Sequence, residues 1–420
     1  MPKPEEWIPL YLPEVPASLE WLKLSPINCL VVEKPTEELS KRVNRLGIDL
    51  VAMDALDSQV NLVRQAKWPG VPSSTGASGA ISSGPTGSPW VDSNAWLSDL
   101  ARVKNPEKPA WIVAHPSADS GMLRNEAYML AVIDAAVYGS RWLVSLDPAL
   151  RKGFAGGNSE ALLTWQKICQ TIGFFDTNKL TWSAYKPVVR LRIVSDFEGP
   201  NKALAGELLN LCHRRNLPFR ILDPATVDAK SLEGLKAVVF VMDKVPEARI
   251  HTVMGQLLQG GGLAIVPSSL AGLTASMKSN GKPEGKPAGS SENGYDLRAY
   301  GQGRVAVAKK AWADPYQLAA DVHLLMSRSN DVIRLWNAGT TNALYTASSD
   351  GKKGLVQVVN YATRAFGHPV SLYVASPYKT ATLSVIANRE PEPLPVIPKG
   401  EGVEVNLPPF DVYSAIEFGA

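Results

Sequence analysis

The sequence predicts an α/β protein that ends in a separate antiparallel β-region, and three observations carry this prediction. Up to residue 312, apolar runs alternate with segments of helical periodicity, which is typical of parallel sheets whose strands are joined by helices. From residue 341 onward, short alternating runs recur every ten residues or so (about 8–12 is usual in such folds) with turn residues between them, which indicates a β-sandwich. At 420 residues, the chain is long enough for two or three domains.

Composition and charge narrow the function classes. Lys plus Arg total 43 against 40 for Asp plus Glu, and the net charge of +3 implies no nucleic-acid partner. The three cysteines are far apart, without metal-ligand spacing, so we expect buried thiols, no metal and no cofactor. No stretch reaches the roughly 18 apolar residues of a membrane span. We expect a soluble protein with no membrane partner, either cytoplasmic or secreted after loss of a signal peptide.

The region 1–185 reads as strands and helices in alternation. Thr36 and Gly47 mark the start and the end of its first helix. The segment 60–68 is expected to continue as helix. The Gly, Ser and Pro residues of 69–89 predict a long loop, which is either a disordered insertion or a substrate lid. The expected strands are 6–13, 27–33, 48–54, 108–116 and 140–148, and the expected helices are 36–47, 92–106, 125–139 and 159–175.

The region 186–312 reads as a complete flavodoxin-like α/β domain. A second polar, Gly- and Pro-rich loop is expected at 278–294. A connecting helix is expected within 313–335, and the β-sandwich fills 336–420. The expected strands of the α/β domain are 188–196, 218–223, 235–243, 263–267 and 303–310, with helices at 199–216 and 246–261.

Polar residues follow four of the apolar strands of the region 1–185. They are Glu33, Asp54, His115 and Asp147. In a (β/α) barrel the functional groups sit at the carboxyl ends of the parallel strands, so these side chains are expected to converge on one rim. Mutual repulsion among three carboxylates would raise the pKa of at least one of them and supply a protonated acid.

Each of these residues has a catalytic and a structural interpretation. Glycoside cleavage needs two carboxyl groups about 5 to 9 Å apart, and Glu33 with Asp147 or Asp54 is the pairing that the strand ends offer. We assign the acid to Glu33, because its longer side chain reaches further into a cleft. Alternatively, the three carboxylates are strand-end residues that cap helices or pair with lysines. His115 is either a proton shuttle or a hydrogen-bonded core group.

Tryptophan is abundant, with 11 residues. Trp111 and Trp142 lie inside expected strands and are assigned to the core. Trp68 and Trp90 bracket the loop 69–89, where a flat apolar face could stack on a sugar ring. They are therefore the candidate substrate-binding residues, with packing between domains as the alternative.

A resemblance to a known family rests on several of these segments. KPAWIVAHP, EAYMLAVIDAAVYGSRWLVSLD and ALLTWQKI resemble the last two strand and helix units of retaining glycosidase barrels. LKAVVFVMD and LLQGGGLAIVP are similar to the glutamine-amidotransferase-like trimerisation domain of family 42 β-galactosidases. GLVQVVNYA and LPPFDVYSAIEF resemble the C-terminal sandwich of many glycosidases. The resemblance implies a carbohydrate substrate, a homo-oligomer and the domain order barrel, α/β domain, sandwich. Amidotransferase chemistry is not expected, because Cys212 lies inside a helix.

The chain departs from that family in its first region. The family barrel has eight strands, with catalytic glutamates at the ends of the fourth and seventh, whereas about five strands are counted here. No Asn-Glu pair of the kind that usually carries the acid/base is found. The strand that should bear the nucleophile ends in His115 instead. The sequence therefore predicts a shortened or incomplete TIM-like barrel. The sequence favours a glycoside hydrolase that acts on an oligosaccharide or polysaccharide through two carboxylates. The alternative is a non-catalytic carbohydrate-binding or assembly protein that keeps the fold.

Overall fold

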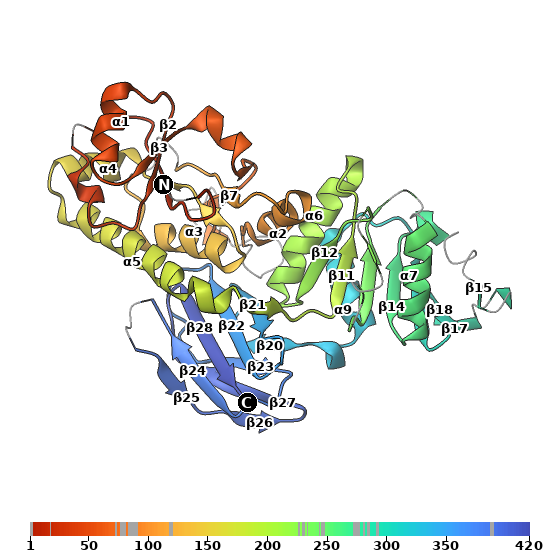
Figure 1. The fold of residues 1–420 in the computed structure, drawn as a ribbon. Coiled ribbons are helices and arrows are strands. Elements are labelled where there is room, and N and C mark those ends of the chain that lie inside the picture. The colour runs from red at the N-terminus through yellow and green to blue at the C-terminus, as the bar shows by residue number, and fades with distance from the viewer. Residues whose placement is uncertain are drawn as a thin grey trace.

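The computed structural model divides into two α/β regions and a pair of antiparallel sheets. Figure 1 shows the first region in red to yellow, the second in green and the antiparallel sheets in blue. The structure describes residues 3–16, 18–71, 74–75, 81–82, 91–116, 121–225, 227–228, 232, 234–242, 244, 248–271, 278–279, 282–283, 286–290, 294–386 and 390–420. Trp90, most of the loop 69–89 and part of the loop 278–294 lie outside these residues.

The first region is built on parallel strands in the orders β3-β2-β1-β9 and β4-β7-β8. Leu143 alone separates β8 from β9, so the two sheets continue into each other through residues 141–145. Among the described residues no ladder joins β3 to β4, and the short helix η2 (Met53–Ser58) connects them. The strands are β1 (Pro9–Tyr11), β2 (Cys29–Val32), β3 (Asp49–Ala52), β4 (Asn61–Val63), β7 (Ala110–Ile112), β8 (Arg141–Trp142) and β9 (Val144–Ser145).

The segment predicted as helix 60–68 forms no helix and contains the strand β4 (Asn61–Val63) instead. Asn61 pairs in parallel with Ala110 and Val63 with Ile112. The apolar stretch is too short to form a stable helix, and its β-branched Val60 and Val63 fit a sheet that offers a free edge at β7. This strand, β4, adds to the five that the sequence predicts.

The helices of the first region follow the predicted pattern closely. Thr36 caps α1, since its Oγ1 accepts a hydrogen bond from Leu39 N at 3.2 Å. At the next helix Ser93, one of two predicted caps, accepts from Ala95 N at 3.1 Å. The sequence does not predict α4, whose first residue is Pro148. The helices are α1 (Glu37–Asn44), α2 (Ala95–Lys104), α3 (Asn125–Val137), α4 (Pro148–Ala155) and α5 (Ser159–Trp182), with a 3₁₀ turn η1 (Glu20–Leu22).

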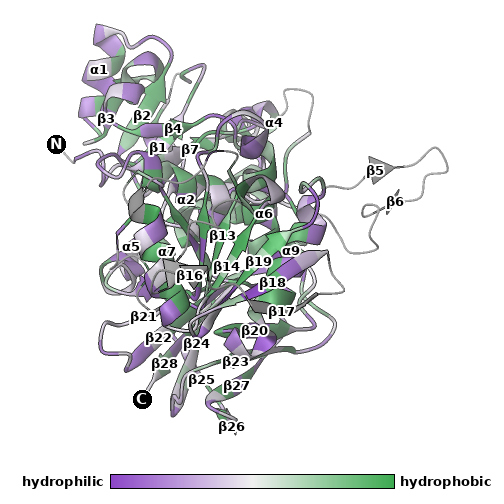
Figure 2. Cartoon of the chain, turned by 90° about the vertical axis from the view of Figure 1, so that its right-hand side faces the viewer, coloured by the Kyte–Doolittle hydropathy of each residue, from purple (hydrophilic) through white to green (hydrophobic). Residues whose placement is uncertain are grey.

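The second region contains a seven-stranded sheet in the order β12-β11-β13-β14-β19-β18-β17. Its first five strands are parallel, and their order 2-1-3-4-5 is that of flavodoxin-like folds, as predicted. The apolar colouring of β13, β14 and β19 in Figure 2 fits strands covered on both faces. The strands are β11 (Leu191–Val194), β12 (Phe219–Leu222), β13 (Ala237–Phe240), β14 (Leu263–Val266), β17 (Lys286–Ser290), β18 (Tyr295–Tyr300) and β19 (Gly303–Ala308).

Helices cover both faces of this sheet. One face packs on α6 (Gly199–Arg214) and α9 (Pro315–Met326), and the other on α7 (Ala248–Gln259). Helix α9 is the predicted connecting helix and is part of the core of the α/β region. Helix α2 of the first region also packs here, and Gly206 permits it, because a Cβ at this position would lie 2.9 Å from the Trp96 ring.

Two antiparallel sheets form the C-terminal region, in the orders β10-β21-β22-β28-β24-β25 and β20-β23-β27-β26. They pack face to face through one shared apolar cluster, which confirms the predicted antiparallel packing. Strand β10 (Lys186–Pro187) joins them from before the α/β region, which the sequence boundaries do not anticipate. The other strands are β20 (Ile333–Trp336), β21 (Thr341–Ala347), β22 (Lys353–Asn360), β23 (Val370–Val374), β24 (Thr380–Ser384), β25 (Glu392–Leu394), β26 (Ile397–Lys399), β27 (Gly402–Leu407) and β28 (Tyr413–Gly419).

The cysteines are free thiols in this structure. Burial raises the pKa of Cys169 and of Cys212 to about 12 each, and burial with the nearby Asp49 charge raises that of Cys29. We expect less than one thiol per chain to react with iodoacetamide in about an hour at pH 8, because the thiolate is the nucleophile. In urea all three should react. Rapid labelling of Cys212 in the folded protein, measured by mass spectrometry, would contradict the packing of α6.

Candidate functional site

The carboxyl ends of the parallel strands bring four polar side chains together in the first region. Tyr11 ends β1, Glu33 follows β2, His115 lies beyond β7 and Ser145 ends β9. Tyr11 Oη donates to Glu33 Oε1 at 2.5 Å, and His115 Nδ1 lies 2.9 Å from Ser145 Oγ. The rings of Tyr11 and His115 are 5.0 Å apart between centroids. We call these four residues the rim cluster.

Burial and neighbouring groups determine the protonation of Tyr11 and His115 in the rim cluster. Burial and the hydrogen bond to Glu33 raise the pKa of Tyr11 to about 12, so its phenol remains a donor at neutral pH. Burial lowers the pKa of His115, against a smaller opposing effect of the Glu33 charge, so the imidazole is neutral at pH 7. Glu33 itself is exposed to solvent. The cluster therefore presents an accessible carboxylate beside a phenol and a neutral imidazole.

Asp147, predicted on the same rim, is turned into the protein. Its side chain is fully buried, and it caps α4 by accepting from Leu150 N at 2.7 Å through Oδ1. Its other oxygen accepts from Leu123 N at 3.0 Å and from the Tyr128 hydroxyl at 2.8 Å. With three donors on it, this carboxylate is the helix cap that the sequence left open as the alternative.

The other predicted residues have different surroundings. Asp54 is exposed in the first turn of η2, beyond the end of β3. The Trp68 ring packs edge-on against Tyr128 at 5.4 Å and Trp142 at 5.2 Å, at the margin of the first core. Its role as a sugar platform stays a prediction, as does that of Trp90, which lies outside the described residues. The structure thus joins Glu33 and His115 and separates Asp147 from them.

Sequence reasoning missed two members of the rim cluster, Tyr11 and Ser145. Both end parallel strands, in YLP and SLD, and this position was the available signal. The candidates drawn from the strand ends were carboxylates and a histidine, and the hydroxyl groups at equivalent positions were not among them. A census of every polar strand-end residue would have found them.

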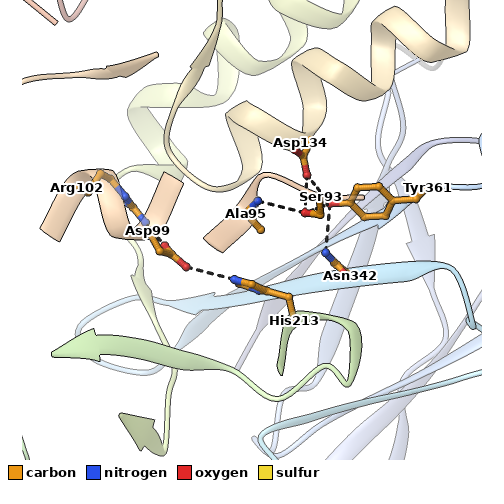
Figure 3. A network of polar contacts seen from close by, with 8 residues as sticks. All are labelled: Ser93, Ala95, Asp99, Arg102, Asp134, His213, Asn342 and Tyr361. Atoms are coloured by element: carbon orange, nitrogen blue, oxygen red, sulfur yellow. Dashed lines mark hydrogen bonds and ion pairs between the residues drawn. The ribbon is translucent and has the colours of Figure 1, made fainter. Parts of the chain in front are cut away.

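A second polar network lies at the junction of the first region with the antiparallel sheets (Figure 3). Asp134 on α3 is fully buried and accepts from Tyr361 Oη at 2.5 Å, Ser93 Oγ at 2.9 Å and Asn94 N at 2.8 Å. Asn342 on β21 donates to the same Tyr361 hydroxyl at 3.3 Å. This network ties α3 and the start of α2 to the antiparallel sheet, and its burial makes it structural.

A buried imidazole links α2 to the α/β region. His213 Nε2 on α6 lies 3.3 Å from Asp99 Oδ2 on α2. Asp99 also pairs with Arg102, and these two partners outweigh burial and hold the pKa of Asp99 below its usual value. Neither network nor any other place in the described part of the chain gathers three His, Cys, Asp or Glu side chains in a metal-binding arrangement.

The architecture is that of a glycoside hydrolase-like fold, and solved structures support this class. An α-L-fucosidase isoenzyme 2 from Paenibacillus thiaminolyticus superposes with TM-score 0.54 at 10% identity, over 95% of this chain and 78% of that one. A β-galactosidase from Bacillus circulans sp. alkalophilus gives 0.53 at 8% identity, over 93% of this chain and 63% of that one. A GH42 β-galactosidase, Gan42B, gives 0.50 at 9% identity, over 78% and 56%.

The fold thus resembles that of the family 42 β-galactosidases, as the sequence resemblance predicts. The chain spans less than two thirds of the length of these two β-galactosidases. No protein-family model matches the sequence, and no curated protein matches it. Among the described helices, none combines the length and the apolar character that a bilayer crossing requires.

Proposed function

We propose that this chain is a carbohydrate-binding protein that keeps a glycosidase-like fold, with a shortened barrel, and does not hydrolyse its ligand by a two-carboxylate mechanism. One observation carries the proposal. The Asp147 carboxylate, one of the two predicted partners of Glu33 in a hydrolytic pair, is fully buried and accepts hydrogen bonds from Leu123, Tyr128 and Leu150. Glu33 is left with Tyr11 and His115 as its neighbours in the rim cluster.

The rim cluster has the chemistry of a sugar-binding site. Sugar hydroxyls both donate and accept, and an exposed carboxylate accepts from two of them in charge-assisted hydrogen bonds. Tyr11 orients the Glu33 carboxylate with its 2.5 Å bond. Ser145 occupies His115 Nδ1, which leaves Nε2 as the remaining polar atom of that ring.

Hydrolysis through Glu33 and Asp54 is the second candidate. Both carboxylates are exposed, and they follow neighbouring strands, since β2 and β3 pair in parallel with Val32 opposite Ala52. Neighbouring strands lie about 4.8 Å apart, a spacing compatible with the carboxyl separation of glycosidases. The binding role is preferred because Asp54 stands on a short helix beyond the strand end and no described contact joins it to the rim cluster.

Assembly into a homo-oligomer belongs to the proposal as well. The resemblance of the α/β region to a trimerisation domain supports it, as does the open edge between β3 and β4 in the described residues, because exposed strand edges favour pairing with another chain.

A binding titration tests the role of Glu33. Replacing Glu33 by Gln removes the charge and keeps the shape, so the affinity for a bound oligosaccharide should fall by about 10- to 100-fold, the effect of about 1.5–3 kcal/mol for a hydrogen bond to a charged group. Calorimetry with α-L-fucosides and β-galactosides would measure this.

Glu38→Gln is the matched control, because Glu38 is exposed on α1 and outside the rim cluster. It should leave the affinity within about twofold, since substitutions of this kind act locally. Equal weakening by both variants, or no weakening by Glu33→Gln, would remove the rim cluster from the binding site.

A further inference from the structure

A cleft lies between the α/β region and the antiparallel sheets, and none of its lining residues belongs to the rim cluster. Its volume is ≈ 1040 Å³, at the upper end of the range for small-ligand sites, about 300–1,000 Å³. It is formed by the end of α6, the turn η5 (Arg328–Asn330), the end of β20 and the loop 361–369.

The lining of this cleft has one sign of charge. Four arginines and two histidines line it, and no aspartate or glutamate does: they are Arg214, Arg215, Arg328, Arg364, His323 and His368. The chain as a whole carries a net charge of only +3, so this concentration is local. A cleft lined by one sign of charge focuses its field and attracts ions of opposite sign.

Internal pairing does not account for all of these cations. Arg214 and Arg215 stand at the C-terminal end of α6, where positive charge favours the helix dipole, and the Arg215 guanidinium lies 5.1 Å from the centre of the Tyr316 ring. Arg328 and Arg364 are exposed, and no carboxylate among the described residues forms an ion pair with either of them. These two guanidinium groups are available to an incoming anion.

The carboxylate that contacts His323, a residue of the cleft lining, is already engaged. Asp331 is buried, accepts from Arg334 Nε at 3.1 Å and lies 2.9 Å from His323 Nε2. It therefore holds His323 in place and does not neutralise Arg328 or Arg364 across the cleft.

Aromatic rings stand among the cations. Trp336 is 39% exposed at the end of β20, with Lys399 Nζ at 5.0 Å from its ring centre. The rings of Phe366 and His368 stack at 6.3 Å with an angle of 16°. Flat apolar faces beside arginine forks suit a ligand that has both ring faces and anionic groups with two oxygens to pair with a guanidinium.

From this lining we infer that the cleft binds an acidic oligosaccharide, one that carries carboxylate or sulfate groups on its sugar rings. Arginine pairs with such groups through two parallel N–H donors, and Trp336 offers a face to a ring. The inference goes beyond the rim cluster, since it concerns another site with another ligand chemistry, and it takes from the proposed function the sugar nature of the ligand.

The test is a titration of the full chain with three tetrasaccharides of equal length. Tetragalacturonate carries carboxylates alone, sulfated maltotetraose carries sulfates alone, and maltotetraose is neutral. At least one acidic probe should bind, with an affinity that falls as NaCl is raised from about 50 to about 200 mM, because ions screen exposed charges. The probe that binds identifies the anionic group.

Matched charge variants locate the binding. The double variant Arg328→Gln/Arg364→Gln should weaken the acidic probe at least tenfold, and Trp336→Ala should weaken it further. The control Arg45→Gln/Arg298→Gln removes the same charge from exposed positions outside the cleft and should change the affinity less than twofold. The Glu33→Gln substitution should weaken the binding of neutral glycans equally in the wild type and in the Arg328→Gln/Arg364→Gln variant. A negative result at the cleft therefore leaves the proposed sugar site at the rim cluster untouched, and the reverse also holds.

Several results would overturn the inference. They are absence of binding by both acidic probes, equal weakening by the two double variants, equal affinity for maltotetraose, and tighter binding of a single-stranded oligonucleotide with the same number of charges. The last result would assign the cleft to nucleic acid instead of sugar.

Discussion

Replacing Asp134 by Ala should destabilise the protein by about 1–3 kcal/mol, the cost of a buried donor that loses its acceptor. Asn94 N, Ser93 Oγ and Tyr361 Oη all donate to this carboxyl, which is fully buried. The two hydroxyls keep each other as partners at 2.9 Å, but Asn94 N loses its acceptor. Urea unfolding followed by tryptophan fluorescence would measure the loss.

The pH dependence of this effect has a defined sign. Burial raises the pKa of Asp134, against the hydrogen bonds that lower it. An acid with a higher pKa in the folded chain binds more protons there, so its contribution to stability falls as pH rises from about 3.9, the ordinary value, through the raised pKa. The stability difference between wild type and Asp134→Ala should therefore be larger near pH 4 than near pH 7.

An exposed aspartate provides the control for Asp134→Ala. Asp176→Ala removes a half-exposed carboxylate 3.9 Å from Arg141 and should change stability by less than about 0.5 kcal/mol. A cost below about 1 kcal/mol for Asp134→Ala would mean that the junction network is not formed as described.

Asp147→Ala should cost about 3 kcal/mol, through a different mechanism. It removes the cap of α4, worth about 1 kcal/mol, and leaves Leu123 N and the buried Tyr128 hydroxyl without their acceptor. Asp54→Ala is the matched control at another strand end and should be nearly neutral, because Asp54 is exposed. The measurement is thermal and urea unfolding of both variants.

This pair of variants separates the two interpretations of Asp147. A folded Asp147→Ala protein of unchanged stability that had lost its ligand would place Asp147 in the binding site and contradict its role as a helix cap.

The expectation that functional groups lie at the carboxyl ends of parallel strands identified where polar residues gather. It did not predict which of their side chains face solvent and which face the core. Glu33 and His115 meet in the rim cluster, whereas Asp147 occupies an equivalent sequence position and turns inward. The distinguishing signal was local: Asp147 precedes Pro148, and aspartate before proline is a typical start of a helix. Recognition of that signal would also have predicted α4.

Contacts between residues that are distant in the sequence could not be predicted from local patterns. A charged residue inside the apolar helix NEAYMLAVIDAAVYG requires a buried partner, but Tyr361 is 227 positions away in the sequence. The helix predicted at 60–68 was wrong because pairing with β7 decides the state of such a short stretch. The strong helical and parallel-strand patterns of 199–267 were predicted well, since their periodicity is set by burial on both faces of the sheet.

The central claim is that the chain binds carbohydrate without cleaving it. A direct measurement is to incubate the full chain with nitrophenyl α-L-fucosides and β-galactosides, and with whichever oligosaccharide calorimetry finds bound, and to follow the products by chromatography over a day. The account predicts saturable binding that Glu33→Gln weakens, with no product above the protein-free control. Turnover by the wild type that is abolished in folded Glu33→Gln or Asp54→Asn variants would contradict it and establish the chain as a glycoside hydrolase.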